Sequence, residues 1–154
     1  MILPAYAVRF NGVATSAAIT LAQIKAPACC ALEIMRAFIS QYGTTTSLQE
    51  RIQLCRKTTR ATIPAFTPIA LSCSQQAAYA VASSCSNGSG VATSEGTDGN
   101  ILWEEGFNVL NGWQYLPVPE ERITVEPGEG VGLKFPTAPT TQNWTGGIYF
   151  RELR

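Results

Sequence analysis

The stretch that decides the fold is residues 101–154, which read ILWEEGFNVLNGWQYLPVPEERITVEPGEGVGLKFPTAPTTQNWTGGIYFRELR. It contains short runs of β-branched, aromatic and other apolar residues, separated by Asn-Gly, Pro-Gly and pairs of prolines. The strand-like runs are 101–105, 107–110, 113–116, 122–125, 131–135 and 147–153. Many short strands with turn signals at this spacing predict an all-β chain that folds as a jelly-roll-like β-sandwich.

The last two of these runs also predict part of the core. Apolar residues occupy one parity of each run, and successive side chains of a strand point to opposite faces. The predicted core residues are Val131, Leu133, Phe135, Ile148 and Phe150. Trp103, Trp113 and Tyr115 have large apolar rings, so we expect them in the core or in an interface between subunits.

Strands are also predicted before residue 100. The clearest is 51–56, whose alternation predicts that Ile52 and Leu54 face inward. The residues predicted to face outward are Arg51, Gln53 and Cys55. Residues 18–24 predict a further strand. Residues 28–40 fit either a strand or a helix, and the breaker residues on either side favour the strand.

Turn and breaker residues divide the first hundred positions. Asn11-Gly12 predicts a hairpin turn that ends a first strand. Two prolines in 63–71 cannot donate ladder hydrogen bonds, so this segment is predicted to be a sheet edge or an extended loop. We therefore expect a single domain, residues 1–154, with an N-terminal arm (1–8) and a flexible loop (83–100).

Composition limits the possible functions. The chain has 154 residues, of which 14% are charged, and it contains no histidine. This length suits one domain with a substantial core. Without histidine, the chain lacks the side chain most often used for acid–base catalysis near neutral pH and the commonest metal ligand. No run approaches the roughly 20 apolar residues of a membrane span, so no membrane partner is predicted.

Charge is divided between the two halves of the chain. Residues 1–77 hold seven Lys and Arg and two acids, a balance of +5, whereas residues 78–154 hold four and nine, a balance of −5. Two interpretations remain open. The chain either presents a basic and an acidic patch to different neighbours, which would favour head-to-tail packing, or its halves interleave and the charges average out.

Cysteine usage points to a reducing compartment. The five cysteines are Cys29, Cys30, Cys55, Cys73 and Cys85, and none forms a Cys-x-x-Cys pair. A zinc site is therefore not predicted. The odd count, the adjacent pair and an N-terminus without a signal-peptide pattern predict reduced thiols in a protein made in a cytosol. A bridge between Cys73 and Cys85 remains an alternative.

Acidic pairs and glycines do not predict a catalytic site. Glu104-Glu105 and Glu120-Glu121 are adjacent residues, and neighbours on a strand point to opposite faces, so neither pair converges across a bond. The glycines of 128–132 precede a strand, whereas a phosphate loop requires a helix. The serines have no histidine base. We therefore expect a protein that is not an enzyme, with no catalytic, cofactor-binding or metal-binding residue.

The basic residues of the first half form one cluster. Its members are Arg51, Arg56, Lys57 and Arg60. The cluster lacks the interleaved aromatic residues of a base-stacking platform. It is interpreted as a solvated or protein-docking face, and no nucleic-acid partner is predicted.

The C-terminal stretch carries a family resemblance. The blocks that carry it are WEEGFNVLNGWQYLPVPEER (103–122), Pro127-Gly128, LKFPTAP (133–139) and GIYFRE (147–152). They resemble small virion proteins of tailed bacteriophages, of the head cement or decoration type. The resemblance is close over the last third of the chain and loose over the first hundred residues.

The resemblance implies a function in assembly. The expected protein is a β-sandwich subunit that binds the outer surface of the major capsid protein shell as a homotrimer and stabilises the head. It would be made in the host bacterial cytoplasm, lie on the capsid surface of the virion and need no cofactor. Expected contacts are the N-terminal arm, the 83–100 loop and a set of side chains. That set is Met1, Tyr6, Arg51, Arg56, Lys57, Arg60, Trp113 and Tyr115.

A second hypothesis is a tail or head-fibre component that binds a host surface glycan. Loops rich in Thr, Asn and Gly, together with Trp144, are residue types that hold sugars. An enzyme is the third class, and it would need a metal or carboxylate site that the sequence does not indicate.

Overall fold

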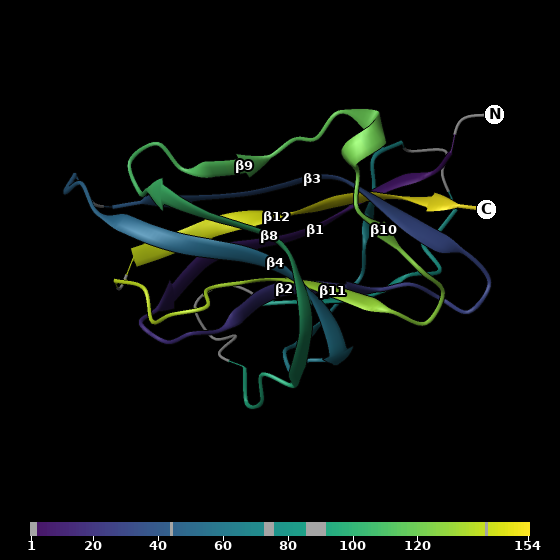
Figure 1. Ribbon diagram of the computed structural model, residues 1–154, viewed down its shortest axis with the longest axis horizontal. Helices are drawn as coiled ribbons and strands as arrows, with labels where there is room; N and C mark the ends of the chain where they lie inside the picture. Colours follow the sequence, from purple (N-terminus) through teal and green to yellow (C-terminus); the bar gives the residue numbers. More distant parts are fainter. Residues whose placement is uncertain (1–2, 44, 73–75, 86–91, 141) are drawn as a thin grey trace.

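The computed structural model describes residues 3–43, 45–72, 76–85, 92–140 and 142–154, and it contains two antiparallel β-sheets (Figure 1). Sheet A has the order β10 (Thr124–Val125), β3 (Ala31–Tyr42), β12 (Gln142–Leu153), β1 (Ala5–Thr15) and β6 (Ile69–Ala70), with β9 (Trp113–Tyr115) also paired to β3. Sheet B has the order β5 (Ala65–Phe66), β7 (Val81–Ser84), β2 (Thr20–Lys25), β11 (Gly130–Lys134), β4 (Gln49–Thr59) and β8 (Thr97–Asn108). A 3₁₀ turn, η1 (Pro119–Glu121), joins β9 to β10.

The first strand pairs with the last, and each following strand pairs with one correspondingly earlier from the C-terminal end. β1 pairs with β12, β2 with β11, β3 with β9 and β10, and β4 with β8. β9 and β10 contact different parts of β3, so together they form one interrupted strand. This is the pairing order of a jelly roll, in which a long hairpin wraps into two packed sheets. The all-β, jelly-roll-like sandwich expected from the sequence is confirmed.

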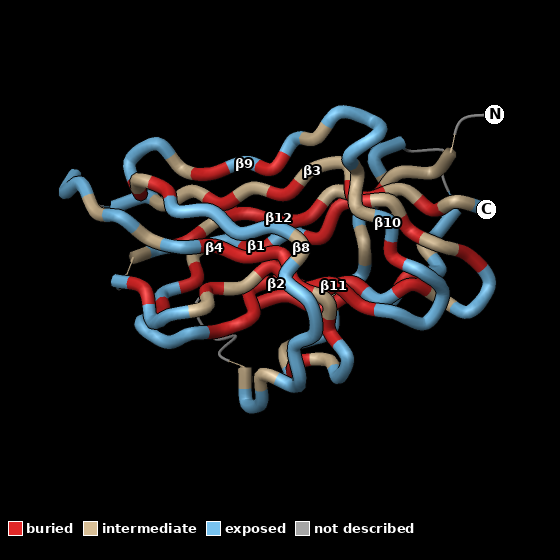
Figure 2. Tube along the Cα trace, in the orientation of Figure 1, coloured by how far each residue is buried: buried red, intermediate tan, exposed pale blue. Residues whose placement is uncertain are grey.

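The core lies between the two sheets. Figure 2 shows buried residues along the inner strands and exposed residues along most of β8, which ends sheet B. All five core residues predicted from the two C-terminal strands are buried: Val131, Leu133, Phe135, Ile148 and Phe150. Ile52 and Leu54 are buried as well. The alternation of the best strands therefore predicts the core correctly, because each pairs with strands on both sides and must bury one face.

The predicted hairpin turn at Asn11-Gly12 is wrong. β1 continues through these residues to Thr15, and its register against β12 shifts between Phe10 and Val13. Gly12 has φ of 65°, a left-handed conformation that glycine adopts without strain. The dipeptide therefore forms a bulge inside a long strand, because the same positive φ serves a bulge as well as a turn.

Strand boundaries differ from the predictions in several places. The strand predicted over 28–40 is present as β3, but it begins at Ala31 and ends at Tyr42. The proline-bearing segment 63–71 supplies short edge strands, β5 and β6. The two runs within 101–110 are one strand, β8. β1 begins at Ala5, inside the predicted arm, because it pairs there with β12 and β6. Within the predicted 83–100 loop, β7 extends to Ser84 and β8 begins at Thr97, and residues 86–91 lie outside the described residues.

The outward face of sheet B is covered by the chain that runs between β4 and β8. Gln23 is buried on that face, and its amide hydrogen-bonds both backbone groups of Ala61 and the Ser83 hydroxyl. Nearby, the Glu95 carboxylate accepts hydrogen bonds from the backbone N–H and the hydroxyl of Thr20. Gln53 and Cys55 were predicted to face solvent, but both are buried. The Cys55 thiol lies against the Gly132 carbonyl and near Asp98 and Lys57. Sheet A has no comparable cover over its central strands among the described residues.

Candidate functional site

The predicted basic cluster is largely neutralised by carboxylates from the second half of the chain. Arg51 pairs with Glu104 at 2.9 Å, and Arg56 pairs with Glu129. The Arg60 guanidinium donates to the Ser83 hydroxyl at 2.9 Å, and burial lowers its pKa. The two halves of the chain therefore interleave at this face, and the cluster presents less free positive charge than its sequence suggests.

The fourth member, Lys57, has a fully buried side chain. Its ammonium binds the carboxylate of Asp98 and the backbone oxygen of Glu95, and Lys134 binds the second oxygen of Asp98. Gly132 lies beneath the Lys57 side chain, and a Cβ there would be 2.8 Å from Lys57 Cε. This group of two cations and one carboxylate fastens β8 onto β4 and β11.

Replacing Asp98 with asparagine tests this group. Burial alone would raise the Asp98 pKa, but hydrogen bonds and attraction from Lys134 and Lys57 outweigh it, so the pKa lies below its usual value. We expect D98N to lower the free energy of unfolding by about 1–2 kcal/mol at neutral pH, since a buried ammonium loses its counter-charge. Urea unfolding of both proteins measures this.

The sign of the pH dependence follows from the lowered pKa. The Asp98 contribution is complete above the unfolded pKa of about 3.9 and disappears as pH falls through the lower folded pKa. The two unfolding curves should therefore converge in acid. Glu126 is exposed and has no cationic partner among the described residues, so E126Q is the matched control. A D98N deficit that persists below about pH 2 would contradict the assignment.

The other predicted contact residues lie mostly in the interior. Tyr6, Trp113 and Tyr115 are buried. Tyr6 donates a hydrogen bond to the backbone oxygen of Gln76, and Tyr115 donates one to that of Glu121. Met1 lies outside the described residues. In this chain these three rings are therefore part of the interior, and a partner would meet other side chains first.

One side of the sandwich, where the edge strands β8 and β9 meet, is apolar and acidic. The rings of Trp103 and Tyr115 meet at 5.2 Å, and both Trp103 and Trp113 donate to the Glu105 carboxylate. We call this the β8/β9 side. Its exposed apolar residues are Ile101, Trp103, Leu116 and Val118, which are 55%, 42%, 65% and 55% exposed. Its exposed acids without a cationic partner, among the residues the structure describes, are Glu105, Glu120 and Glu121.

The outward face of sheet A carries aromatic and arginine side chains. Arg9 on β1, Gly147 on β12 and Phe38 on β3 lie in one row across the sheet. The next row places Tyr149 beside Arg36, and the Arg36 guanidinium lies 4.8 Å from the Phe38 ring centre and 5.8 Å from that of Tyr149. Such stacking occupies the face of the guanidinium and leaves its N–H edge available.

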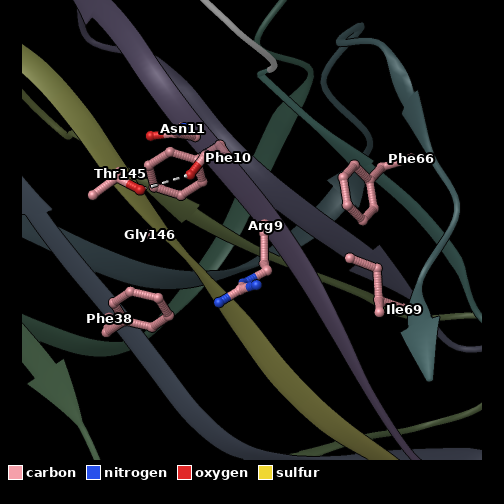
Figure 3. A pocket seen from close by; sticks show the side chains of 8 residues that line it. All are labelled: Arg9, Phe10, Asn11, Phe38, Phe66, Ile69, Thr145 and Gly146. Atoms are coloured by element: carbon pink, nitrogen blue, oxygen red, sulfur yellow. Dashed lines mark hydrogen bonds between the residues drawn. The ribbon is translucent and has the colours of Figure 1, made fainter. Parts of the chain in front are cut away.

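A groove of about 540 Å³ opens on this face. Gly146 lines it, and the neighbouring Gly147 places no side chain between Arg9 and Phe38. A Cβ at Gly147 would collide with the backbone of Val8. We call it the Arg9 groove. Figure 3 shows Arg9 between the Phe38 ring on one side and Phe66 and Ile69 on the other. Asn11 and Thr145 complete its polar lining.

A second hollow, of about 360 Å³, lies on the other side of Phe38. It is lined by Arg36, Ser40, Asn111 and Gln114 among others. We call it the Arg36 hollow. Neither Arg9 nor Arg36 has a carboxylate partner among the described residues, and Arg36 Nε is buried without a hydrogen bond. The two hollows therefore repeat one pattern: a free guanidinium beside amide and hydroxyl groups, with Phe38 between them.

Sequence reasoning missed these residues. Simple alternation would place Arg36 and Phe38 on the same face as the buried Leu32 and Ile34. A register shift between Ile34 and Arg36 reverses the parity, so Ala37 and Ile39 are buried instead and Arg36 and Phe38 face outward. Their relation to Arg9 depends on β12 lying between β1 and β3, and this order is set by pairing between the two ends of the chain. Phe66 comes from the proline-bearing segment that was predicted only as an edge or loop.

Nucleophiles and metal ligands are not gathered in the part of the chain that the structure describes. Burial raises the pKa of the thiols of Cys55 and Cys85 to about 11 and about 12, so both stay protonated near neutral pH. Cys85 is unbridged, and Cys73 lies outside the described residues. Across those same described ranges, no three acids or cysteines cluster as metal ligands, and no helix has the length and hydropathy to span a bilayer.

Comparison with known proteins gives no relative: no protein-family model, curated protein or solved structure matches the chain.

Proposed function

We propose that this chain is a structural assembly protein: a capsid cement or decoration subunit that forms a homotrimer and binds the major capsid protein shell of a tailed bacteriophage. The observation that supports the assembly function is the β8/β9 side, where exposed apolar side chains and acids without a cationic partner among the described residues lie on β8 and on the residues that follow β9. Large exposed apolar areas on a soluble domain mark interaction surfaces. The phage shell as the partner rests on the resemblance of the last third of the chain.

A ring of three identical subunits needs two different surfaces in each contact. The β8/β9 side offers two, because β8 ends sheet B while β9 and η1 lie along the edge of sheet A. Trp103 is exposed on the first, and Leu116 and Val118 are exposed on the second. Around a threefold axis, the β8 part of one copy would pack on the β9 part of the next. Many weak contacts of such trimers with a shell add up to firm attachment.

Mass in solution tests the trimer. Leu116 and Val118 are largely exposed, so L116E together with V118E should leave the fold intact and bury two charges in the interface. We expect light scattering to give a trimer for the unaltered protein and a monomer for the double variant. L71E is the matched control, because Leu71 is 50% exposed and follows β6 at the opposite edge of sheet A. A monomeric unaltered protein at high concentration would reject the trimer.

Imaging of the particle tests the shell as partner. Density for this chain at many equivalent positions of the outer capsid surface is the expected result. Density confined to the tail would reject the cement function and favour a fibre component. The two measurements are separate. A trimer that does not bind the capsid would support self-assembly and reject the capsid as partner.

A further inference from the structure

The outward face of sheet A carries two guanidinium groups, those of Arg9 and Arg36, that the proposed assembly surface does not include. The Arg9 groove extends from β12 across β1 to Phe66 and Ile69, and the Arg36 hollow lies between β3 and β9. The exposed apolar residues of the β8/β9 side line neither of them. The two guanidinium groups have no carboxylate partner among the described residues, although seven other basic side chains do. A guanidinium presents a rigid fork of N–H donors that fits a carboxylate with two parallel hydrogen bonds.

We propose that these two hollows bind an acidic polysaccharide, whose sugar rings lie across Phe38 and whose carboxylates pair with Arg9 and Arg36. The lining has what such a ligand requires. Asn11 and Thr145 in one hollow, and Ser40, Asn111 and Gln114 in the other, supply donors and acceptors for sugar hydroxyls. Phe38, Phe66 and Ile69 supply apolar surface for the C–H faces of the rings.

The spacing of the two arginines fits a polymer. β12 separates β1 from β3, and Arg36 lies two residues along β3 from the row of Arg9. Two strand spacings and one side-chain repeat place the two Cα atoms roughly 12 Å apart. A short run of linked sugar rings spans this distance, so alternate or neighbouring acidic sugars would meet one arginine each.

Other ligands fit less well. An extended acidic peptide that joins a sheet needs a free edge, and β12 and β3 are paired on both sides at this face. β1 pairs with β6 only at Tyr6 and Ala7, so the acidic peptide is tested directly below with polyglutamate. A nucleic-acid backbone requires a row of free cations along its track. On this face Arg151 and Arg122 bind Glu33, and Arg9 and Arg36 are the two arginines without a carboxylate partner among the described residues. An uncharged sugar would leave both guanidinium groups without a carboxylate, including that of Arg36, whose Nε is buried without a hydrogen bond.

Titration calorimetry with oligogalacturonate tests the proposal on the full chain. We expect the unaltered protein to bind it. The dissociation constant of R9Q should be at least about tenfold higher, since a charged hydrogen-bonded pair is lost. K25Q is the matched control, because Lys25 is also exposed and unpaired among the described residues but lies on sheet B. Because Arg36 stacks on two rings, R36Q is used only after circular dichroism shows that it folds.

Three further probes decide what is recognised. The methyl-esterified oligosaccharide has the same rings without carboxylates, and we expect no measurable binding to it. Polyglutamate has the carboxylates without the rings, and binding of it with equal affinity would overturn the polysaccharide as ligand. Equal weakening in K25Q would show attraction to overall charge and overturn the site. If light scattering gave a different oligomer mass for R9Q than for the unaltered protein, the Arg9 groove would be a protein interface instead.

Discussion

Replacing Trp144 with alanine is expected to lower the free energy of unfolding by about 4 kcal/mol and the melting temperature by on the order of 10 °C. Trp144 is fully buried in β12, and its ring meets that of Phe135 at 4.9 Å and that of Phe107 at 6.1 Å. The three rings join β12 of sheet A to β8 and to the end of β11 in sheet B. Alanine would leave a cavity that the surrounding strands cannot close.

Phenylalanine at the same position separates packing from hydrogen bonding. The indole Nε1 of Trp144 is buried without a hydrogen-bond partner, so its removal gives up no bond. We therefore expect W144F to cost about 1 kcal/mol, from the smaller ring alone. Thermal and urea unfolding of both variants measure the difference. If W144F were as costly as W144A, the indole N–H would have to contribute a bond, and the packing explanation would be wrong.

Sequence predicted the parts of the fold that depend on local alternation. Val131, Leu133 and Phe135 alternate with small or polar residues, and this pattern places them inward whichever strands flank them. It did not predict that Asn11-Gly12 forms a bulge, because a positive φ is common to turns and bulges. Gly106 likewise resembled a break between two strands, although it continues β8.

The candidate site was beyond sequence reasoning for a different reason. The predicted contact cluster was chosen by closeness in the chain, whereas the carboxylates that neutralise Arg51 and Arg56 come from β8 and from residue 129. Arg9 and Arg36 are far apart in sequence and share a face only through β12. The pairing of the first strand with the last is therefore what forms the site, and no local pattern encodes it.

The second large effect is expected at the end of β12, where Glu152 is fully buried. One carboxylate oxygen accepts hydrogen bonds from the backbone N–H groups of Tyr79 and Ala80, at 2.7 and 2.9 Å. The other accepts from the Arg154 guanidinium, whose centre lies 4.2 Å from the Tyr79 ring. Glu152 thus holds residues 76–80, the segment that leads into β7, against the C-terminal strand.

Alanine at position 152 is expected to lower the free energy of unfolding by about 3 kcal/mol, since two N–H groups lose their acceptor. Hydrogen exchange should then accelerate at Tyr79 and Ala80 more than at the amides of β11. Glutamine is the sharper comparison, because its carbonyl oxygen can still accept from both N–H groups while the attraction for Arg154 is lost. We expect E152Q to cost about 1 kcal/mol and to keep the two amides protected. Equal losses in E152A and E152Q, with equal exposure of Tyr79 and Ala80, would show that the charge pair with Arg154, and not the backbone hydrogen bonds, holds this segment in place.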